Sequence, residues 1–366
     1  MAIVILFLLL SSELFSLSYY SYDFRDVNAT FNFNLALDAK SDKLPFNIFD
    51  QEWKSIPDHK KNNNAFGQVY SDIYVDYEGL KLGVFGEKLA KIKINDGFVE
   101  LMYQAQKDFA RLLADKDIYK KLEEKPIEGK GNSYEAYGLF VQKVFNFHPH
   151  HYLSAKLKLS YAKELEYIQV DGYTSSDKFT GKLDYIYSSK NLISKGENNS
   201  DTPSGIGYGV DIEYIYNNDK LYLYLGAFNL ASYIYWDNVT LMHYDFDSEV
   251  IYKGDDGYNH YRPFGRGEYK YNISFKQKLP SYYRVSLNYE LFDNFAIGNN
   301  LKVYQNLYAY EPYINVKIYT GRYKLGYEIQ SRTVLFGAYF KNIHLEISNK
   351  FGPSNTILNA RCRISF

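Results

Sequence analysis

Polar and apolar residues alternate one by one along most of this chain, and this alternation limits the possible folds more than any other feature of the sequence. In residues 283–291, Tyr, Val, Leu, Tyr and Leu alternate with Arg, Ser, Asn and Glu. Residues 323–329 and 153–160 show the same pattern. A period of two places successive side chains on opposite faces of a β-strand. The chain is therefore expected to be all-β, built from strands with one apolar and one polar face.

The length of these segments indicates how the strands assemble. They are about ten residues long, the length of a tilted strand that crosses a bilayer. Many are joined by short polar turns such as Asn217-Asn218-Asp219. In lipid every backbone group must be paired internally, so a membrane-spanning sheet has to close on itself. We therefore expect a closed antiparallel transmembrane β-barrel of about 14 strands, within about 12 to 16, since single-chain bacterial barrels normally have an even number.

The composition fits a membrane barrel and excludes one class of partner. The 366 residues include 40 Tyr and 25 Phe, and tyrosine suits the two interfaces of a bilayer because its ring is apolar and its hydroxyl is polar. A Tyr-rich soluble all-β protein is the alternative. The 42 basic and 43 acidic residues nearly balance and form no block of like charge, so no nucleic-acid partner is expected.

The N-terminus resembles an export signal. Residues 2–10 are an unbroken apolar run, and Ser16-Leu17-Ser18 has the small-x-small form of a signal-peptidase site, although no Lys or Arg precedes the run. We therefore expect a signal peptide at residues 1–18, with a buried N-terminal strand or helix as the alternative. Residues 19–65 are expected to be an N-terminal segment that partly fills the lumen, and residues 66–366 the barrel.

The last strand indicates a family. Leu358, Ala360, Cys362, Ile364 and the terminal Phe366 lie on one face of it. This alternating strand with an aromatic end resembles the final strand of Gram-negative bacterial outer-membrane β-barrel proteins. The resemblance implies an outer-membrane location, contact with outer-membrane lipid, and a barrel-assembly machinery that reads Ile364 and Phe366.

A second, looser resemblance concerns a single stretch of the chain. Residues 227–236 are small and aromatic. They are similar to a stretch in barrels such as the long-chain fatty acid transporters, a porin-related group.

One segment breaks the alternation. Around residues 96–122 the apolar residues follow helical spacing, with Asp96 as the expected N-cap. An amphipathic helix inserted here has two possible positions: packed on the barrel rim, or folded into the lumen as a plug. The residues that would form the plug are Phe98, Leu101, Met102, Phe109 and Leu112.

The polar faces of the strands are the candidates for function. We find no motif of a catalytic, cofactor or metal site and expect no enzyme activity. If the apolar faces meet lipid, the polar faces line the lumen, and their charges either set the selectivity of a pore or pair across the lumen and fill it. The candidate lumen-lining residues are Lys270, Lys276, Arg284, Glu290, Arg322, Lys324, Glu328, Glu346, Arg361 and Arg363.

Three functions remain open from the sequence. The first is a passive channel or transporter for small solutes through a charged lumen. The second is a non-conducting surface adhesin or envelope-assembly anchor. The third is the uptake of hydrophobic compounds, which the aromatic content favours.

Overall fold

The structure is a computed structural model, and it confirms the all-β class with one inserted helix. It describes residues 29–41, 61–107, 124–174, 179–188, 202–247, 251–253, 259–261, 265–304, 307–330, 332–340, 343–350 and 359–365. Among these residues, no helix has both the length and the apolar character needed to cross a bilayer.

Seventeen of the described strands form one large sheet, and β10 and β11 form a separate small one. The elements in chain order are β1 (Ala29–Ser41), β2 (Asn62–Tyr77), β3 (Leu80–Asn95), α2 (Asp96–Lys107), β4 (Lys125–His148), β5 (His151–Thr174), β6 (Phe179–Tyr187), β7 (Ser204–Asn217), β8 (Leu221–Phe228), β9 (Tyr233–Asp247), β10 (Ile251–Lys253), β11 (Asn259–Tyr261), β12 (Gly265–Lys278), β13 (Tyr282–Phe292), β14 (Phe295–Tyr304), β15 (Leu307–Ile318), β16 (Gly321–Glu328), β17 (Thr333–Tyr339), β18 (Ile343–Lys350) and β19 (Asn359–Ser365).

The antiparallel ladders return to their starting strand. β1 pairs with β2 on one side and with β19 on the other. From β2 the ladders run through β3, β4, β5, β7 and β8 to β13. From β13 they run in chain order through β14 to β19. Within the described residues these ladders link fourteen strands in a circuit, and the space that it encloses is called the lumen here.

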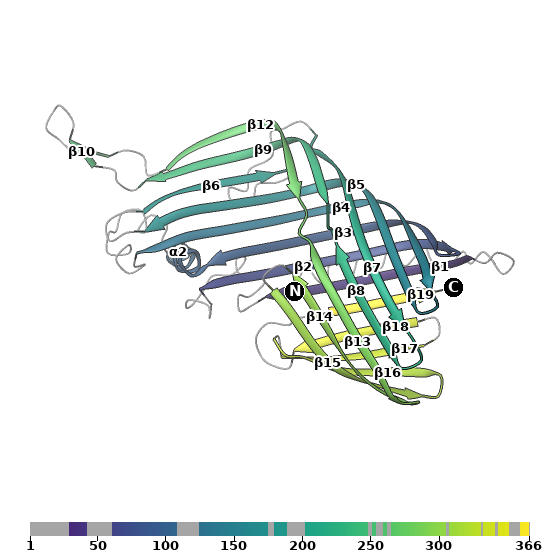
Figure 1. The fold of residues 1–366 in the computed structure, drawn as a ribbon. Coiled ribbons are helices and arrows are strands. Elements are labelled where there is room, and N and C mark those ends of the chain that lie inside the picture. The colour runs from purple at the N-terminus through teal and green to yellow at the C-terminus, as the bar shows by residue number, and fades with distance from the viewer. Residues whose placement is uncertain are drawn as a thin grey trace.

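The wall is much longer along its strands on one side than on the other, as Figure 1 shows. The side with β3–β6, β9 and β12 is called the tall wall here, and the side with β13–β18 is called the short wall. The C-terminal half of β5, residues 166–174, pairs with β6. β6 in turn pairs with β9, and β9 pairs with β12. β8 and β9 follow one another along the same side of β7, interrupted at residues 229–232. β12 and β13 follow one another along β9 and β8 in the same way, interrupted at residues 279–281. The two interruptions lie side by side, since the Leu279 amide donates to the Ser232 carbonyl at 3.0 Å.

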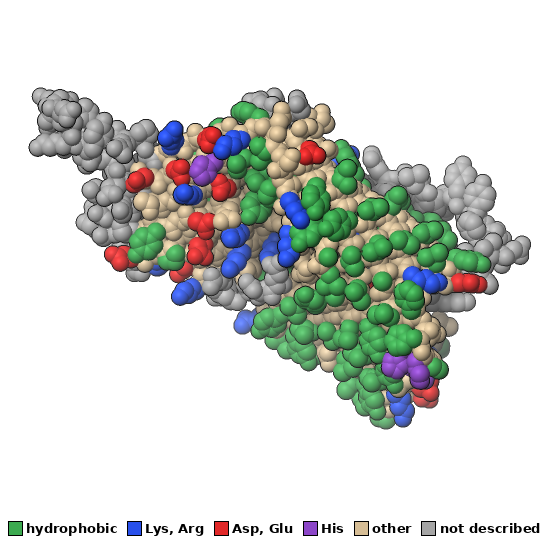
Figure 2. Space-filling view, turned by 45° about the horizontal axis from the view of Figure 1, so that its top comes forward, with side chains coloured by type: hydrophobic (Ala, Val, Ile, Leu, Met, Phe, Trp, Pro, Cys, Tyr) green, Lys and Arg blue, Asp and Glu red, His purple; other side chains and the backbone are tan. Residues whose placement is uncertain are grey.

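The outer face of the circuit is apolar, as the alternation predicts. Outward side chains such as Leu139, Leu159 and Leu325 are 63%, 65% and 44% exposed. Figure 2 shows apolar side chains gathered over the wall formed by β7, β8 and β13–β16, and charged ones over β6, β9 and β12. The inward side chains of the same strands are mostly buried and polar.

The facing predicted for Lys276 is wrong. The ladder between β9 and β12 shifts register between Lys270 and Phe275, and Asn272 there has a φ of 54°. A bulge of this kind adds a residue and reverses the alternation beyond it. Lys276 therefore lies on the outer face, with its Nζ 4.2 Å from the centre of the Tyr233 ring, while Phe275 packs inward.

The helix α2 lies on the outer side of the tall wall. Phe98 and Val99 pack with Ile94, Ile127 and Val170, which share the face of the exposed apolar side chains and not that of the lumen. Leu101 and Met102 lie at the edge of this cluster. This placement agrees with the rim position, and Phe109 and Leu112 fall outside the described residues.

The N-cap predicted for this helix is displaced by one residue. The Asn95 side-chain oxygen accepts hydrogen bonds from the amides of Phe98 at 2.9 Å and Glu128 at 3.0 Å. Asn95 therefore caps the Phe98 amide, while the Asp96 carboxylate accepts the Gly97 amide at 3.0 Å.

The N-terminal expectations concern residues that are for the most part not described. Residues 1–18 and most of residues 19–65 lie outside the described residues. The part that is described, β1, is a strand of the wall rather than a filling of the lumen.

Candidate lumen constriction

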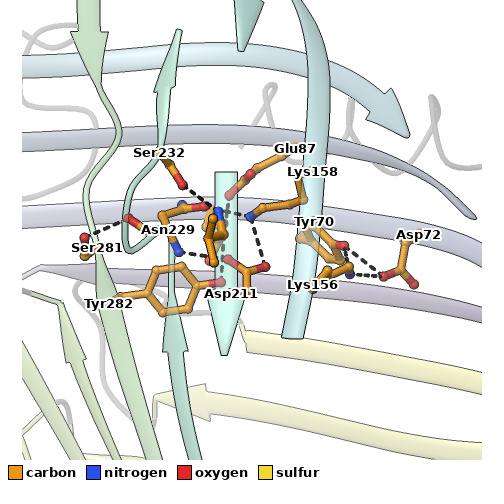
Figure 3. Close-up of polar contacts among 12 residues, drawn as sticks. Tyr70, Asp72, Glu87, Lys156, Lys158, Asp211, Asn229, Ser232, Ser281 and Tyr282 are labelled. Carbon is orange, nitrogen blue, oxygen red and sulfur yellow. Dashed lines mark hydrogen bonds and ion pairs between the residues drawn. The ribbon is translucent and has the colours of Figure 1, made fainter. Parts of the chain in front are cut away.

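A lysine from β5 holds the interruption between β8 and β9 inside the lumen. Lys158 Nζ lies 3.1 Å from the Asp211 carboxylate and 2.7 Å from the Asn229 side-chain oxygen. The same carboxylate accepts the Asn229 amide at 2.8 Å. Asn229 is fully buried with a φ of 53°, a conformation that asparagine tolerates. Figure 3 shows these three residues converging from β5, β7 and the interruption.

A second lysine of β5 is neutralised in the same layer. Lys156 Nζ donates to the Tyr70 hydroxyl at 2.7 Å and lies 3.2 Å from the Asp72 carboxylate. Gln68 is the inward residue that precedes Tyr70 on β2, and its side-chain amide donates to the Glu87 carboxylate at 2.6 Å. Every charge in these contacts is at least 90% buried.

Two further ion-pair clusters continue the layer around the wall. The Asp38 carboxylate of β1 lies 3.1 Å from Arg284 and 2.6 Å from Lys302. These two ion pairs connect β13 and β14 to β1 across the lumen. Lys324 lies between Glu311 at 2.7 Å and Glu346 at 3.1 Å.

In these clusters the lysine and arginine side chains are paired with carboxylates inside the lumen. A buried ion is stable only when it is paired and its remaining hydrogen-bonding groups are satisfied. Here each lysine has one or two carboxylates, so its charge is cancelled where a pore would need it exposed to water. The arrangement can fix strands together, but it offers a passing ion little free charge.

An apolar cluster lies next to these charges, on the side of the tall wall. The inward side chains Phe66, Leu89, Tyr134, Leu165 and Trp236 are each at most 2% exposed. Phe66 lies 4.2 Å from the ring of Tyr304, and Tyr282 stacks on Phe228 at 4.6 Å. Packed aromatic and aliphatic side chains therefore fill the lumen on the side that faces the tall wall. The full cluster consists of Phe66, Leu89, Tyr134, Ala136, Ala162, Leu165, Ile186, Ile234, Trp236, Val239, Leu279, Tyr282, Tyr304 and Leu307.

The predicted lumen-lining residues take several different positions. Lys324 and Glu346 meet each other, Arg322 meets Glu290 at 2.9 Å, and Arg284 meets Asp38. Glu328 is buried. Lys270 lies on the tall wall beside Glu268, and the structure describes only the backbone of Arg361 and Arg363, which pairs with β1 and β18. Ile364 pairs with Phe33, and Phe366 falls outside the described residues.

A separate charged cluster lies on the tall wall, beyond the apolar surface. His243 of β9 has Nδ1 2.5 Å from Asp184 of β6 and Nε2 3.2 Å from Asp245. Lys182 and Glu268 are the charged groups beside it on β6 and β12. The hydrogen bond that the His243 ring donates to the Asp184 carboxylate raises the pKa of His243 above its ordinary value, and the one to Asp245 adds to this rise.

We expect this histidine to make the β6–β9 pairing pH-dependent. Because the folded-state pKa is raised, the stabilisation is fully present below the unfolded pKa of about 6.5 and is lost as the pH rises through the folded-state pKa. Hydrogen exchange of the β6 and β9 amides, corrected for its intrinsic pH dependence, should therefore be faster on the alkaline side. The variant His243→Gln should lose this dependence. Equal protection on both sides in the unmodified protein would contradict the expectation.

Comparison with known proteins gives structural likeness only. No protein-family model matches the chain, and no curated protein matches it in sequence. A mutant of the monoaromatic hydrocarbon channel TodX is similar at a TM-score of 0.43 and 11% identity, covering 93% of this chain and 89% of its own. A Pseudomonas aeruginosa FadL homologue is similar at 0.36 and 9%, covering 92% and 86%.

The Escherichia coli outer membrane protease OmpT is similar at a TM-score of 0.26 and 10% identity, covering 95% of this chain and all of its own. These solved structures are Gram-negative outer-membrane β-barrels, the class and location that the sequence predicts. The likeness is weak and includes both channels and a protease, so it does not distinguish transport from catalysis.

Proposed function

We propose that this chain is a closed transmembrane β-barrel that takes up small hydrophobic compounds, rather than a channel for small solutes through a charged lumen. The observation that carries the proposal is the arrangement of side chains in the lumen. Paired, buried charges lie inside the lumen next to a cluster of aromatic and aliphatic side chains.

The outer face supports the membrane placement. Large apolar side chains are exposed on neighbouring strands all around the circuit, for example Leu82, Leu157, Phe336 and Ile347. A soluble protein rarely exposes a continuous apolar surface of this kind. A bilayer covers such a surface, and the closed circuit leaves no strand edge facing lipid. Outer-membrane lipid is then the main partner of this face, and recognition of Ile364 and Phe366 by an assembly machinery stays a prediction.

The lumen supports an apolar cargo. A polar solute or ion would have to displace the Lys158 and Lys324 ion pairs, which compensate for buried charges. The side chains of Phe66, Trp236 and Tyr304 are at most 4% exposed, so an apolar compound enters this cluster by opening its packing. It then exchanges one apolar contact for another and breaks no ion pair. The aromatic cluster is therefore a more favourable environment for a hydrocarbon than for a sugar or an anion.

The filled lumen is also compatible with a barrel that transports nothing, such as a surface adhesin or an envelope anchor. Among the described residues the same ion pairs that stop ions would also make a rigid, non-conducting scaffold. The two functions differ in whether an apolar compound crosses the membrane.

The test compares three measurements on the full-length protein, with heat-modifiable electrophoretic mobility as the control for folding. We expect no steady current in a planar bilayer, no swelling of proteoliposomes in sugar solutions, and a several-fold faster entry of the fluorescent hydrocarbon derivative N-phenylnaphthylamine into cells that express the protein. Steady current with sugar-driven swelling would identify a polar channel instead. Absence of all three signals from folded protein would favour the anchor.

A further inference from the structure

The outer face of the short wall carries an open hollow of about 640 Å³. Five neighbouring strands, β13 to β17, line it, and its rim is apolar. Leu287, Ile297, Ile314, Leu325 and Val334 contribute to that rim. Its size is within the range of small-molecule sites, about 300–1,000 Å³.

The hollow exists because small residues meet at its centre. Asn299 of β14 is in register with Pro312 of β15, and both are shorter than the tyrosines around them. The inward-facing residues beside them are Gly298 of β14 and Gly326 of β16. A Cβ on Gly298 would lie 2.4 Å from the ring of Tyr313, which crosses this glycine and donates its hydroxyl to the Leu287 carbonyl at 3.2 Å. The floor is therefore a closed, fixed surface.

Asn299 is an unusual residue for this place. By alternation its side chain points outward, with Leu301 and Val303 above it and Ile297 below it on the same face of β14. It carries the one amide side chain in the lining of the hollow. Within the part of the chain that the structure describes, its amide has no hydrogen-bond partner.

An amide in this position needs a partner from outside the chain. An unpaired polar group in hydrocarbon costs several kcal/mol. Lipid tails offer no donor or acceptor. A small molecule with an apolar body and one polar group satisfies both the hollow and the amide.

We propose that this hollow binds an uncharged amphipathic molecule dissolved in the membrane, such as a long-chain alcohol, phenol or ketone. Its apolar body lies between β13 and β17, and its hydroxyl or carbonyl group hydrogen-bonds to Asn299, which can donate and accept. A charged head group is disfavoured because the hollow contains no charged side chain. The site rests on the membrane placement of the proposed function and does not depend on transport.

Photolabelling of the full-length protein in lipid nanodiscs tests the site. Two photoactivatable probes of equal chain length are compared, a long-chain alcohol and the matching hydrocarbon, and labelled peptides are mapped by mass spectrometry. We expect the alcohol to label residues 287–334 preferentially, with competition by dodecanol and not by dodecane. Asn299→Leu should lower this labelling between about twofold and tenfold, the range of one typical hydrogen bond.

The control variant is Leu301→Val, which changes the next outward residue of β14 outside the hollow and should leave the labelling unchanged. Asn299→Leu should fold at least as well as the original chain, because it removes a polar group from the lipid-facing surface. Equal labelling of Asn299→Leu, or equal competition by dodecane, would overturn the proposal. Uniform labelling of the outer face by the hydrocarbon probe would still support the membrane placement, whereas its absence would contradict that placement and the proposed function together.

Discussion

Replacing Leu325 with arginine is expected to lower the free energy of unfolding by about 2–4 kcal/mol, the cost of a cation near the bilayer midplane on the lipid face of a barrel. Leu325 lies outward on β16, in register with Ile314 on one side and Phe336 on the other. All three side chains are exposed and apolar, so the arginine would have no protein partner. Reversible urea unfolding in lipid vesicles measures the loss.

The matched control places the same charge at the end of a hairpin. Tyr319 joins β15 to β16 and is 95% exposed. Tyr319→Arg should cost no more than about 1 kcal/mol, because the interface tolerates arginine. If both variants lost the same free energy, the apolar face would not be embedded in a bilayer, and the membrane placement would fail.

The outer face was predictable because lipid imposes a simple rule on the sequence. Every second residue of a spanning strand must be apolar, so the period of two is kept over residues 283–290 of β13 and 323–328 of β16. Among the described residues the ladders link fourteen strands in a circuit, whereas the whole sheet contains seventeen. The last strand was also recognisable, because its alternation continues to the end of the chain.

The bulge in β12 was not predictable in the same way. Asn272 adopts a positive φ and reverses the facing of Lys276, yet the sequence continues to alternate through this point. Lys276 is tolerated outside because it lies over Tyr233 and Tyr235, which its cation attracts. Asparagine is frequent in this chain, so its presence alone does not indicate a bulge.

The ion-pair clusters in the lumen could not be predicted from the sequence for a different reason. Alternation shows which residues point inward, but it gives neither the register nor the partner across the lumen. Asp38 and Arg284 are 246 positions apart, and Asn229 lies in an interruption where no alternation applies. The inward positions Gln68, Tyr70 and Asp72 of β2 were visible as a polar face, which was the signal available for that part of the layer.

Replacing Lys158 with methionine is expected to cost about 3–5 kcal/mol and to give a steady ion current, whereas we expect none from the original chain. The cost arises because the buried Asp211 carboxylate loses its cation. The current follows because Lys158 also holds the Asn229 side chain, so the interruption between β8 and β9 loses one of the contacts that fix it inside the lumen. Urea unfolding and planar-bilayer recording measure the two effects. Lys182→Met is the matched control, since its 3.9 Å pair with Asp245 is exposed and should contribute less than about 1 kcal/mol.

The double variant Lys158→Met with Asp211→Asn separates lost charge pairing from lost packing. An asparagine at position 211 keeps an oxygen that can accept the Asn229 amide, and it removes the unpaired charge. Most of the lost stability should therefore return, while the current should persist if the lysine itself closes the lumen. If the single variant stayed silent although its stability fell, the Lys158 cluster would be a structural contact only, and the barrier to ions would have to lie in another of the paired clusters, around Asp38 or Lys324.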